Sequence, residues 1–193
     1  RNITISKNLE EKDVIDLWTK HLNGQQSLGI VPINENNECV WGAIDVDEYQ
    51  LDLKSLAIRL AQQQLPLVLC RSKSGGAHIF IFLVEPIPAS MLQRKLRQVA
   101  AAIGYGQAEI FPKQTKLLLD RGDRGSTLNM PYFGGENSTR YAYGEEGQAL
   151  TPNEFIEYID KIQIAPKILE QLEASPLNEK QEWLDQAPPC IQH

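Results

Sequence analysis

Residues 40–47 read VWGAIDVD, an apolar run that ends in two carboxylates one residue apart. Alternate side chains of a strand point to the same face, so Asp45 and Asp47 share one face while Ile44 and Val46 take the other. Two adjacent carboxylates repel each other unless a positive charge lies between them. Ligands that are all oxygen favour Mg²⁺ or Mn²⁺ over zinc. The stretch predicts a strand that ends in a metal site, although lone acid pairs are also common at exposed strand ends.

The segments around this stretch alternate between helix and strand patterns. Apolar spacing predicts helices over 9–22, 53–64 and 89–103, and a helix capped by Thr151. Strands are expected at 27–33, 38–47, 67–70, 77–83, 108–111 and 139–143, with the first two forming a hairpin. Residues 113–137 look irregular, and the acidic last forty residues look mostly helical with breaks at Pro166 and Pro176. This order predicts an α+β (mixed α/β) fold.

Charge is distributed unevenly along the chain. The net charge is −6, but residues 71–140 hold ten basic and five acidic side chains, which gives +5 there and −11 elsewhere. A basic middle between acidic flanks is compatible with a local site for a polyanion, and an uneven surface is the alternative.

Cysteine use and hydropathy bear on the surroundings of the protein. Cys39, Cys70 and Cys190 are odd in number and lack CxxC spacing, which argues against a disulfide or zinc framework and for a reducing, cytoplasmic setting. No apolar run is long enough to span a membrane and no signal-peptide pattern is present, so no membrane partner is expected. The chain starts at Arg1, not Met, which is compatible with a processed or excised piece.

Residues 71–78, RSKSGGAH, form a polar turn between two predicted strands, a setting that differs from a P-loop. Glycines let backbone N–H groups approach a phosphate, and hydroxyls and Lys add donors and charge. The candidate phosphate ligands are Ser72, Lys73, Ser74, Gly75, Gly76 and His78. The alternative is a tight hairpin turn with a solvated Lys and a His that is satisfied within the core.

Two later segments complete the set of candidate residues. Glu109 lies on a short predicted strand and could complete a metal shell, with Lys113 near a phosphate. Asn129, in a loop rich in Gly and aromatic residues, could hydrogen-bond a sugar or base. Each has a plain alternative: a solvent-facing Glu before a loop, and a packed loop. Together, three acids, a polar turn, a His and several cations are what two-metal phosphoryl transfer needs.

The motif series resembles the archaeo-eukaryotic primase superfamily, which includes the primase-polymerases. Asp45-Val46-Asp47 is similar to its D-x-D motif, and Ser74 to His78 is similar to its S-x-H motif, with Gly76 where the strict pattern has Ser. Glu109 falls where the third acid belongs, although Asp is more usual there. The likeness is closest to bacterial, plasmid and phage primases of the TOTE conflict-system type. It rests there on the turn from Ser72 to His78, the segment IFPKQ at 110–114, and NMP at 129–131.

The resemblance implies two fused lobes, one of them RRM-like, with a metal site in the cleft. Asp45, Asp47 and Glu109 would hold two Mg²⁺ or Mn²⁺ ions, and Ser72–Gly76, His78 and Lys113 would hold phosphates, with Asn129 at the sugar. It implies templated RNA or DNA synthesis from dNTPs or NTPs on single-stranded DNA, by priming or primer extension.

The resemblance also suggests a division of the chain. It implies a catalytic domain at 1–150 and an acidic helical extension at 151–193. Residues 187–191, APPCI, resemble the start of a helical segment that follows such domains in longer primases. We therefore expect a longer chain that carries a helicase or another replication domain.

Two other functions remain open from the sequence. A DNA-binding module of the replication-initiator type, with a degenerate catalytic site, would tolerate loss of Asp45 and Asp47. A metal-dependent nucleotidyl- or glycosyltransferase with a D-x-D motif would use nucleotide and ignore a template. The acid–acid–His–acid series favours catalysis over the first, and the basic middle favours a template over the second.

Overall fold

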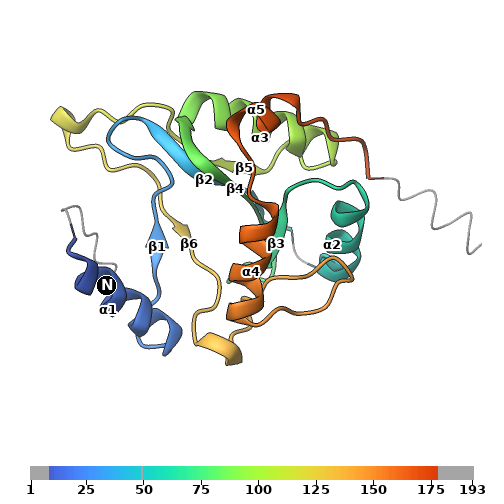
Figure 1. The fold of residues 1–193 in the computed structure, drawn as a ribbon, viewed down its shortest axis with the longest axis horizontal. Coiled ribbons are helices and arrows are strands. Elements are labelled where there is room, and N and C mark those ends of the chain that lie inside the picture. Colours follow the sequence, from blue (N-terminus) through green and yellow to red (C-terminus); the bar gives the residue numbers. More distant parts are fainter. Residues whose placement is uncertain (1–8, 49, 178–193) are drawn as a thin grey trace, which may run out of the picture.

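A four-stranded antiparallel sheet lies at the centre of the computed structural model, which describes residues 9–48 and 50–177. The strand order is β3-β4-β2-β5 (Figure 1). The strands are β2 (Glu38–Val46), β3 (Val68–Arg71), β4 (Ala77–Pro88) and β5 (Glu109–Phe111). With the intervening helices, the order along the chain from β2 to β5 is β-α-β-β-α-β.

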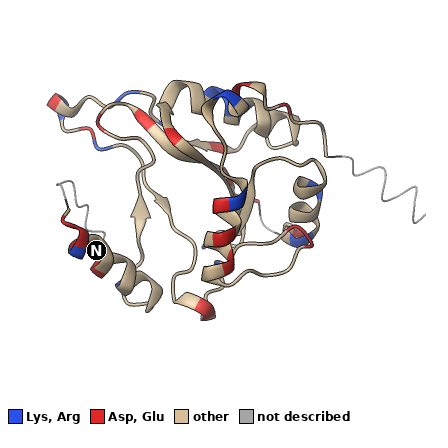
Figure 2. Ribbon diagram, viewed as in Figure 1, with Lys and Arg blue, Asp and Glu red and all other residues tan. Residues whose placement is uncertain are grey.

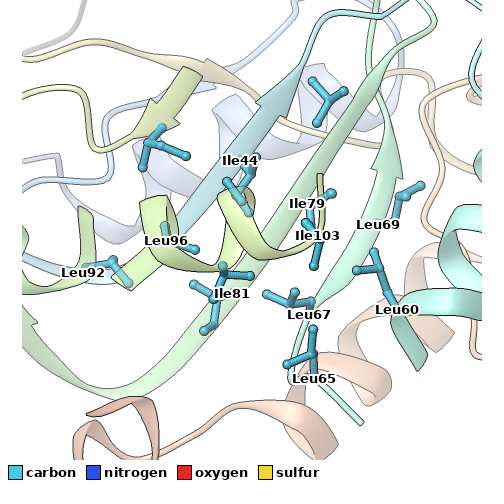
Figure 3. Close-up of a cluster of buried hydrophobic side chains, with 14 of the residues drawn as sticks. Ile44, Leu60, Leu65, Leu67, Leu69, Ile79, Ile81, Leu92, Leu96 and Ile103 are labelled. Atoms are coloured by element: carbon cyan, nitrogen blue, oxygen red, sulfur yellow. The ribbon is translucent and has the colours of Figure 1, made fainter. Parts of the chain in front are cut away.

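Helices α2 (Leu53–Gln62) and α3 (Ala89–Ala102) cover one face of this sheet. Ile44 and Ile79 point toward them, and Leu96 of α3 and Leu60 of α2 fill the space opposite (Figure 3). All four side chains are at most 2% exposed, and Val46 at the end of β2 joins them, so Ile44 and Val46 are committed to this apolar core. Burying several large aliphatic side chains at about 2 kcal/mol each supplies much of the driving force for folding.

The other face of the sheet carries a second apolar cluster. It includes Ala43 of β2, Phe80 of β4 and Phe155 of α4 (Pro152–Ile162). Helix α5 (Pro166–Gln171) follows α4 and buries Leu169 in the first core. Helix α4 begins as expected, with Thr151 and Glu154 in a capping box and Pro at the first turn.

A small two-stranded sheet stands beside this second cluster. It pairs β1 (Gly29–Ile30) with β6 (Leu128–Asn129), and helix α1 (Glu11–Leu22) lies next to it (Figure 1). His21 is fully buried between these parts. Its Nδ1 accepts from the Leu28 N–H at 2.9 Å, and its Nε2 lies 2.7 Å from the Pro131 carbonyl. A neutral ring that donates from Nε2 satisfies both contacts and ties α1 to the chain on either side of the small sheet.

Most predicted elements are confirmed, and the hairpin is wrong. Residues 29–30 pair with β6, not with β2, so 27–33 and 38–47 are not hairpin partners. The region predicted to be irregular, 113–137, contains β6 and two short 3₁₀ turns (Leu119–Arg121 and Gly135–Asn137).

The other differences concern strand lengths and the end of the chain. Strand β4 runs on to Pro88, five residues past its predicted end. Residues 139–143 form only isolated bridges, of which Ala142 to Cys70 lies beside β3. Residues 172–177 are not helical, and the segment at 187–191 lies outside the described residues.

The turn between β3 and β4 packs directly on the end of β2. The Ser72 N–H donates to the Gly76 carbonyl at 2.9 Å, and Gly75 has a φ of +96°, in the left-handed region that glycine adopts easily. A Cβ at Gly76 would overlap the Val46 carbonyl oxygen, so this position accepts no side chain. The departure from the S-x-H pattern at residue 76 therefore has a steric reason.

Gly76→Ser, which restores the S-x-H spacing, is expected to destabilise the protein by at least about 2 kcal/mol because the turn must move off Val46. Thermal or urea unfolding followed by circular dichroism measures this. Gly106→Ser is the matched control, since its nearest neighbour would be Ala101 Cα at 3.5 Å and its φ is not in the left-handed region. Equal stability of the two variants would contradict the steric argument.

Candidate functional site

A cavity of about 460 Å³ lies at the end of β2, on the face of the sheet away from α2 and α3. Every candidate residue from the sequence except Gly75 and Gly76 lines it. These are Asp45, Asp47, Ser72, Lys73, Ser74, His78, Glu109, Lys113 and Asn129. Phe111, Thr127 and Leu128 complete the wall. Residues more than eighty positions apart in the chain therefore meet in one place.

Strand register explains why these residues meet. Asp45 of β2 is paired with His78 of β4 on one side and with Glu109 of β5 on the other. Paired residues of antiparallel strands project from the same face, so all three side chains point away from the α2–α3 core. Asp47 follows two residues after Asp45 and continues the same face past the end of the strand.

Asp45 is the most perturbed carboxyl group of the site. Its side chain is 13% exposed, and burial, followed by the charges of Asp47 and Glu109, raises its pKa from 3.8 to about 6. Lys113 acts in the opposite direction. Oδ1 of Asp45 is buried and has no hydrogen-bond partner in the described structure. A buried carboxylate oxygen without a donor is costly and is well placed to receive a cation.

His78 is neutral near pH 7. Burial is the main cause that lowers its pKa to about 4, against the raising effects of Asp47 and the Asn129 backbone, and the charge of Arg140 adds a smaller lowering effect. Its Nε2 lies 3.3 Å from Asp45 Oδ1, but the geometry is not that of a hydrogen bond. The contact is therefore between a carboxyl group and a neutral imidazole, and it is not a charged ion pair.

Glu109 and Lys113 form an ion pair, with Oε2 and Nζ 2.5 Å apart. The Lys113 ammonium also lies 5.0 Å from the centre of the Phe111 ring. The sequence interpretation assigns these two residues to different ligands, a metal and a phosphate, whereas here they bind each other. Their side chains are 54% and 37% exposed, and exposed ion pairs contribute at most about 1 kcal/mol, so a ligand can separate them.

The turn contributes hydroxyl groups to the cavity. Ser72 is buried, and its Oγ lies 3.0 Å from the Ser74 Oγ. Lys73, between them, is exposed and lines the same wall. Because Gly76 has no room for a hydroxyl, Ser72 and Ser74 are the serines of this turn that face the cavity.

The side chains of the site supply the type of ligand atom that a hard divalent cation prefers, but their positions are not those of a metal site. Asp45, Asp47 and Glu109 supply the carboxylate oxygens that Mg²⁺ and Mn²⁺ prefer, and Oδ1 of Asp45 has no hydrogen-bond partner in the described structure. Within residues 9–48 and 50–177, however, no three His, Cys, Asp or Glu side chains are grouped closely enough to hold an ion. Binding an ion would require the exposed Asp47 and Glu109 to turn toward Asp45.

The positive charge counted from the sequence does not all face this cavity. Arg94, Lys95 and Arg97 lie on α3, which covers the opposite face of the sheet, and acidic residues line α4 (Figure 2). Lys95 donates to the Glu170 and Leu172 carbonyls and so caps α5. A count along the chain cannot distinguish the two faces, and the local positive charge at the site is smaller than +5.

Sequence reasoning did not single out Thr127 and Leu128, which come just before Asn129 in β6 and line the same wall. The candidate Asn129 could have indicated them, because residues next to a site residue in the chain lie close to the same site. It also missed His21, which fixes the position of β1 and hence of β6, and no local pattern marks that role.

Cys39 and Cys70 are buried free thiols, and burial raises the pKa of Cys39 to about 12 and also raises that of Cys70. Cys190 lies outside the described residues. Within the described part of the chain, no helix has both the length and the apolar character that crossing a bilayer requires.

Comparison with known proteins gives a match to a protein family. The family model of the archaeo-eukaryotic primase domain of the TOTE conflict system matches residues 6–165, which include every residue of the cavity. No curated protein matches the chain. Since the matched region spans most of the 193 residues, the chain belongs to the archaeo-eukaryotic primase domain family of TOTE conflict systems.

Proposed function

We propose that this primase-type domain is a nucleotidyltransferase that copies single-stranded DNA, adding dNTPs or NTPs to a primer or to a first nucleotide. The observation that supports it is the single cavity in which Asp45, Asp47 and Glu109 face Ser72, Lys73 and His78. Nucleotidyl transfer needs acids that hold cations beside groups that hold phosphates.

Asp45, Asp47 and Glu109 would hold the two Mg²⁺ or Mn²⁺ ions. Such ions would stabilise the charge of the triphosphate and favour ionisation of the attacking 3′-hydroxyl. The chain's own part is to keep Asp45 buried and short of hydrogen-bond donors, so that its carboxylate gains from any cation that arrives. Asp47 and Glu109, more exposed, can turn toward the same point.

The opposite wall of the cavity would hold the nucleotide. Ser72 and Ser74 hydroxyls and Lys73 would bind phosphate oxygens, and the backbone of Gly75 and Gly76 lets the turn approach them closely. His78, a neutral ring whose one N–H has the Asn129 backbone as its acceptor, would lie beside the phosphates without adding charge. Lys113 would join them after leaving Glu109, and Asn129 would contact the sugar.

The β-α-β-β-α-β order from β2 to β5 supports the RRM-like lobe that we propose as the platform of the site. The template and primer strands, and a helicase or other replication domain in a longer cytoplasmic protein, are the partners that this function calls for. The division of the chain at residue 150 stays a prediction.

A DNA-binding module of the replication-initiator type, with a degenerate catalytic site, is the second candidate. One observation favours it: within the described residues the acids are not grouped to hold an ion, and Glu109 is paired with Lys113. Such a module would bind DNA through the same face and would not need Asp45 or Asp47.

The double variant Asp45→Asn/Asp47→Asn is expected to lose primer extension by at least about a thousandfold, because the cation ligands of nucleotidyl transfer are gone. Labelled primer on a single-stranded template, with Mn²⁺ and all four dNTPs, measures this; omitting single dNTPs shows whether the product follows the template. A parallel reaction without primer tests priming.

The control is Asp160→Asn, an exposed acid on α4, which should extend as the wild type does. Extension by the double variant at the wild-type rate would exclude catalysis by these acids. No extension by the wild type, together with DNA binding that the double variant retains, would support the initiator-type module.

Asp45→Asn alone is expected to raise the stability of the metal-free protein at pH 7.5 by about 1–3 kcal/mol, since the buried charge disappears. The folded pKa of Asp45, about 6, exceeds 3.8, so the wild type gains stability on protonation and loses it as pH rises through 6. The advantage of the variant should therefore shrink between pH 7.5 and pH 4. Urea unfolding in EDTA at several pH values measures it, with Asp160→Asn as control; a pH-independent difference would contradict the assignment.

A further inference from the structure

Arg140 is a cation at the edge of the site that nothing above assigns. It lies two residues after Ser138 and two before Ala142, which bridges to Cys70, and its carbonyl accepts a hydrogen bond from the Tyr132 N–H at 2.8 Å. Cys70 is paired with His78 in β4. Met130, the residue after Asn129, donates its N–H to the Leu28 carbonyl, and Ser27, just before Leu28, accepts a hydrogen bond from the Arg140 guanidinium. Arg140 therefore lies beside the segment that leads from Asn129 of the cavity wall to Tyr132.

Within 9–48 and 50–177, the Arg140 guanidinium is held in place without a negative partner. It lies 5.0 Å from the centre of the Phe133 ring, and Nη1 donates to Ser27 Oγ at 3.3 Å. The Arg140 N–H donates to Ser138 Oγ at 3.0 Å, which fixes the backbone as well. Among the described residues no carboxylate lies within ion-pair distance of Arg140, whereas Lys113 has Glu109.

Most of the Arg140 guanidinium stays open to solvent, where an anion can reach it. Partial burial lowers the pKa of Arg140, with no acid of the described residues acting in the opposite direction, and the same charge lowers the pKa of His21 and of His78. A guanidinium has five N–H donors, and the described contacts use one of them. The contact with the Phe133 ring and the hydrogen bond to Ser27 hold the guanidinium, and its remaining N–H groups can donate to phosphate oxygens.

We propose that Arg140 binds a phosphate group at the rim of the cavity, beside the segment that follows Asn129, and that Phe133 and Ser27 orient it for this task. The inference rests on the proposed function for the identity of the ligand, which is a phosphate of either the nucleic-acid strand or the nucleotide. Arg140 does not line the cavity itself, so the phosphate lies just outside the space that Asp45 and Ser72 enclose.

Two binding measurements on the whole protein test this and separate the sources of phosphate. The first is anisotropy of a fluorescein-labelled single-stranded oligonucleotide in EDTA at several salt concentrations. The second is calorimetric titration with dATP. Arg140→Gln is expected to weaken one of them about tenfold, because one charge-assisted phosphate contact is lost. If the strand supplies the phosphate, the salt dependence should also fall by about one ion, and dATP binding should not change.

Arg140→Lys is the second variant: it keeps the charge, loses the fork, and should fall between the wild type and Arg140→Gln. Arg97→Gln is the matched control, since Arg97 is exposed on α3 on the opposite face of the sheet. Circular dichroism and the melting temperature of each variant show that it is folded.

Unchanged binding of both ligands in folded Arg140→Gln would overturn the proposal. So would an equal loss in Arg97→Gln, or a wild type that binds neither ligand. Neither assay needs catalysis, so a protein that binds phosphate through Arg140 but never extends a primer would contradict the proposed function and leave this inference standing.

Discussion

The central strand β2 packs against the apolar core with one face and lines the cavity with the other, and the rest of the structure depends on this division. Its even positions, Ile44 and Val46, are buried against α2 and α3, and its odd positions end in Asp45 and Asp47. A slip of one residue in register would put carboxylates in an apolar core and aliphatic side chains in the cavity. The apolar core therefore fixes the register, and the register in turn fixes which residues of β4 and β5 face Asp45.

The cavity concentrates unfavourable electrostatics that the surrounding fold must offset. Asp45 is ionised only at a cost, His78 is kept neutral, and Arg140 has no acid partner among the described residues. Groups that lack hydrogen bonds or a counter-charge tend to cluster at ligand sites, because the ligand supplies those interactions when it binds. The two apolar clusters on either side of the sheet, with nearly every member under 9% exposed, supply the stability that allows this.

The sequence predicts the local features of this fold well and its long-range pairings poorly. The D-x-D at a strand end, the Ser/Gly turn and the capping box at Thr151 follow from a few neighbouring residues, and the structure has each of them in place. The predicted hairpin was wrong because strand pairing depends on which segments the tertiary fold brings together. Residues 29–30 pair with β6. Strand β6 has only two residues, lies in a Gly-rich loop and shows no periodic pattern in the sequence. His21 and Gly76 act through residues distant in the chain, at Pro131 and Val46, and no window of sequence reveals such contacts.

The distribution of charge is the clearest case in which a pattern along the chain does not predict the arrangement in space. The basic excess of residues 71–140 includes a helix on the far side of the sheet, while Lys113 is already paired with Glu109. Lys73 lines the cavity, and so does Lys113, which becomes available once a ligand separates it from Glu109, while Arg140 lies outside the lining. A polyanion that approaches this face thus meets a few positioned cations beside carboxylates, in a protein of net charge −6. Long-range attraction is weak under these conditions, so recognition must depend on short contacts of defined geometry, and an oriented guanidinium contributes more to such recognition than an equal charge on a mobile side chain.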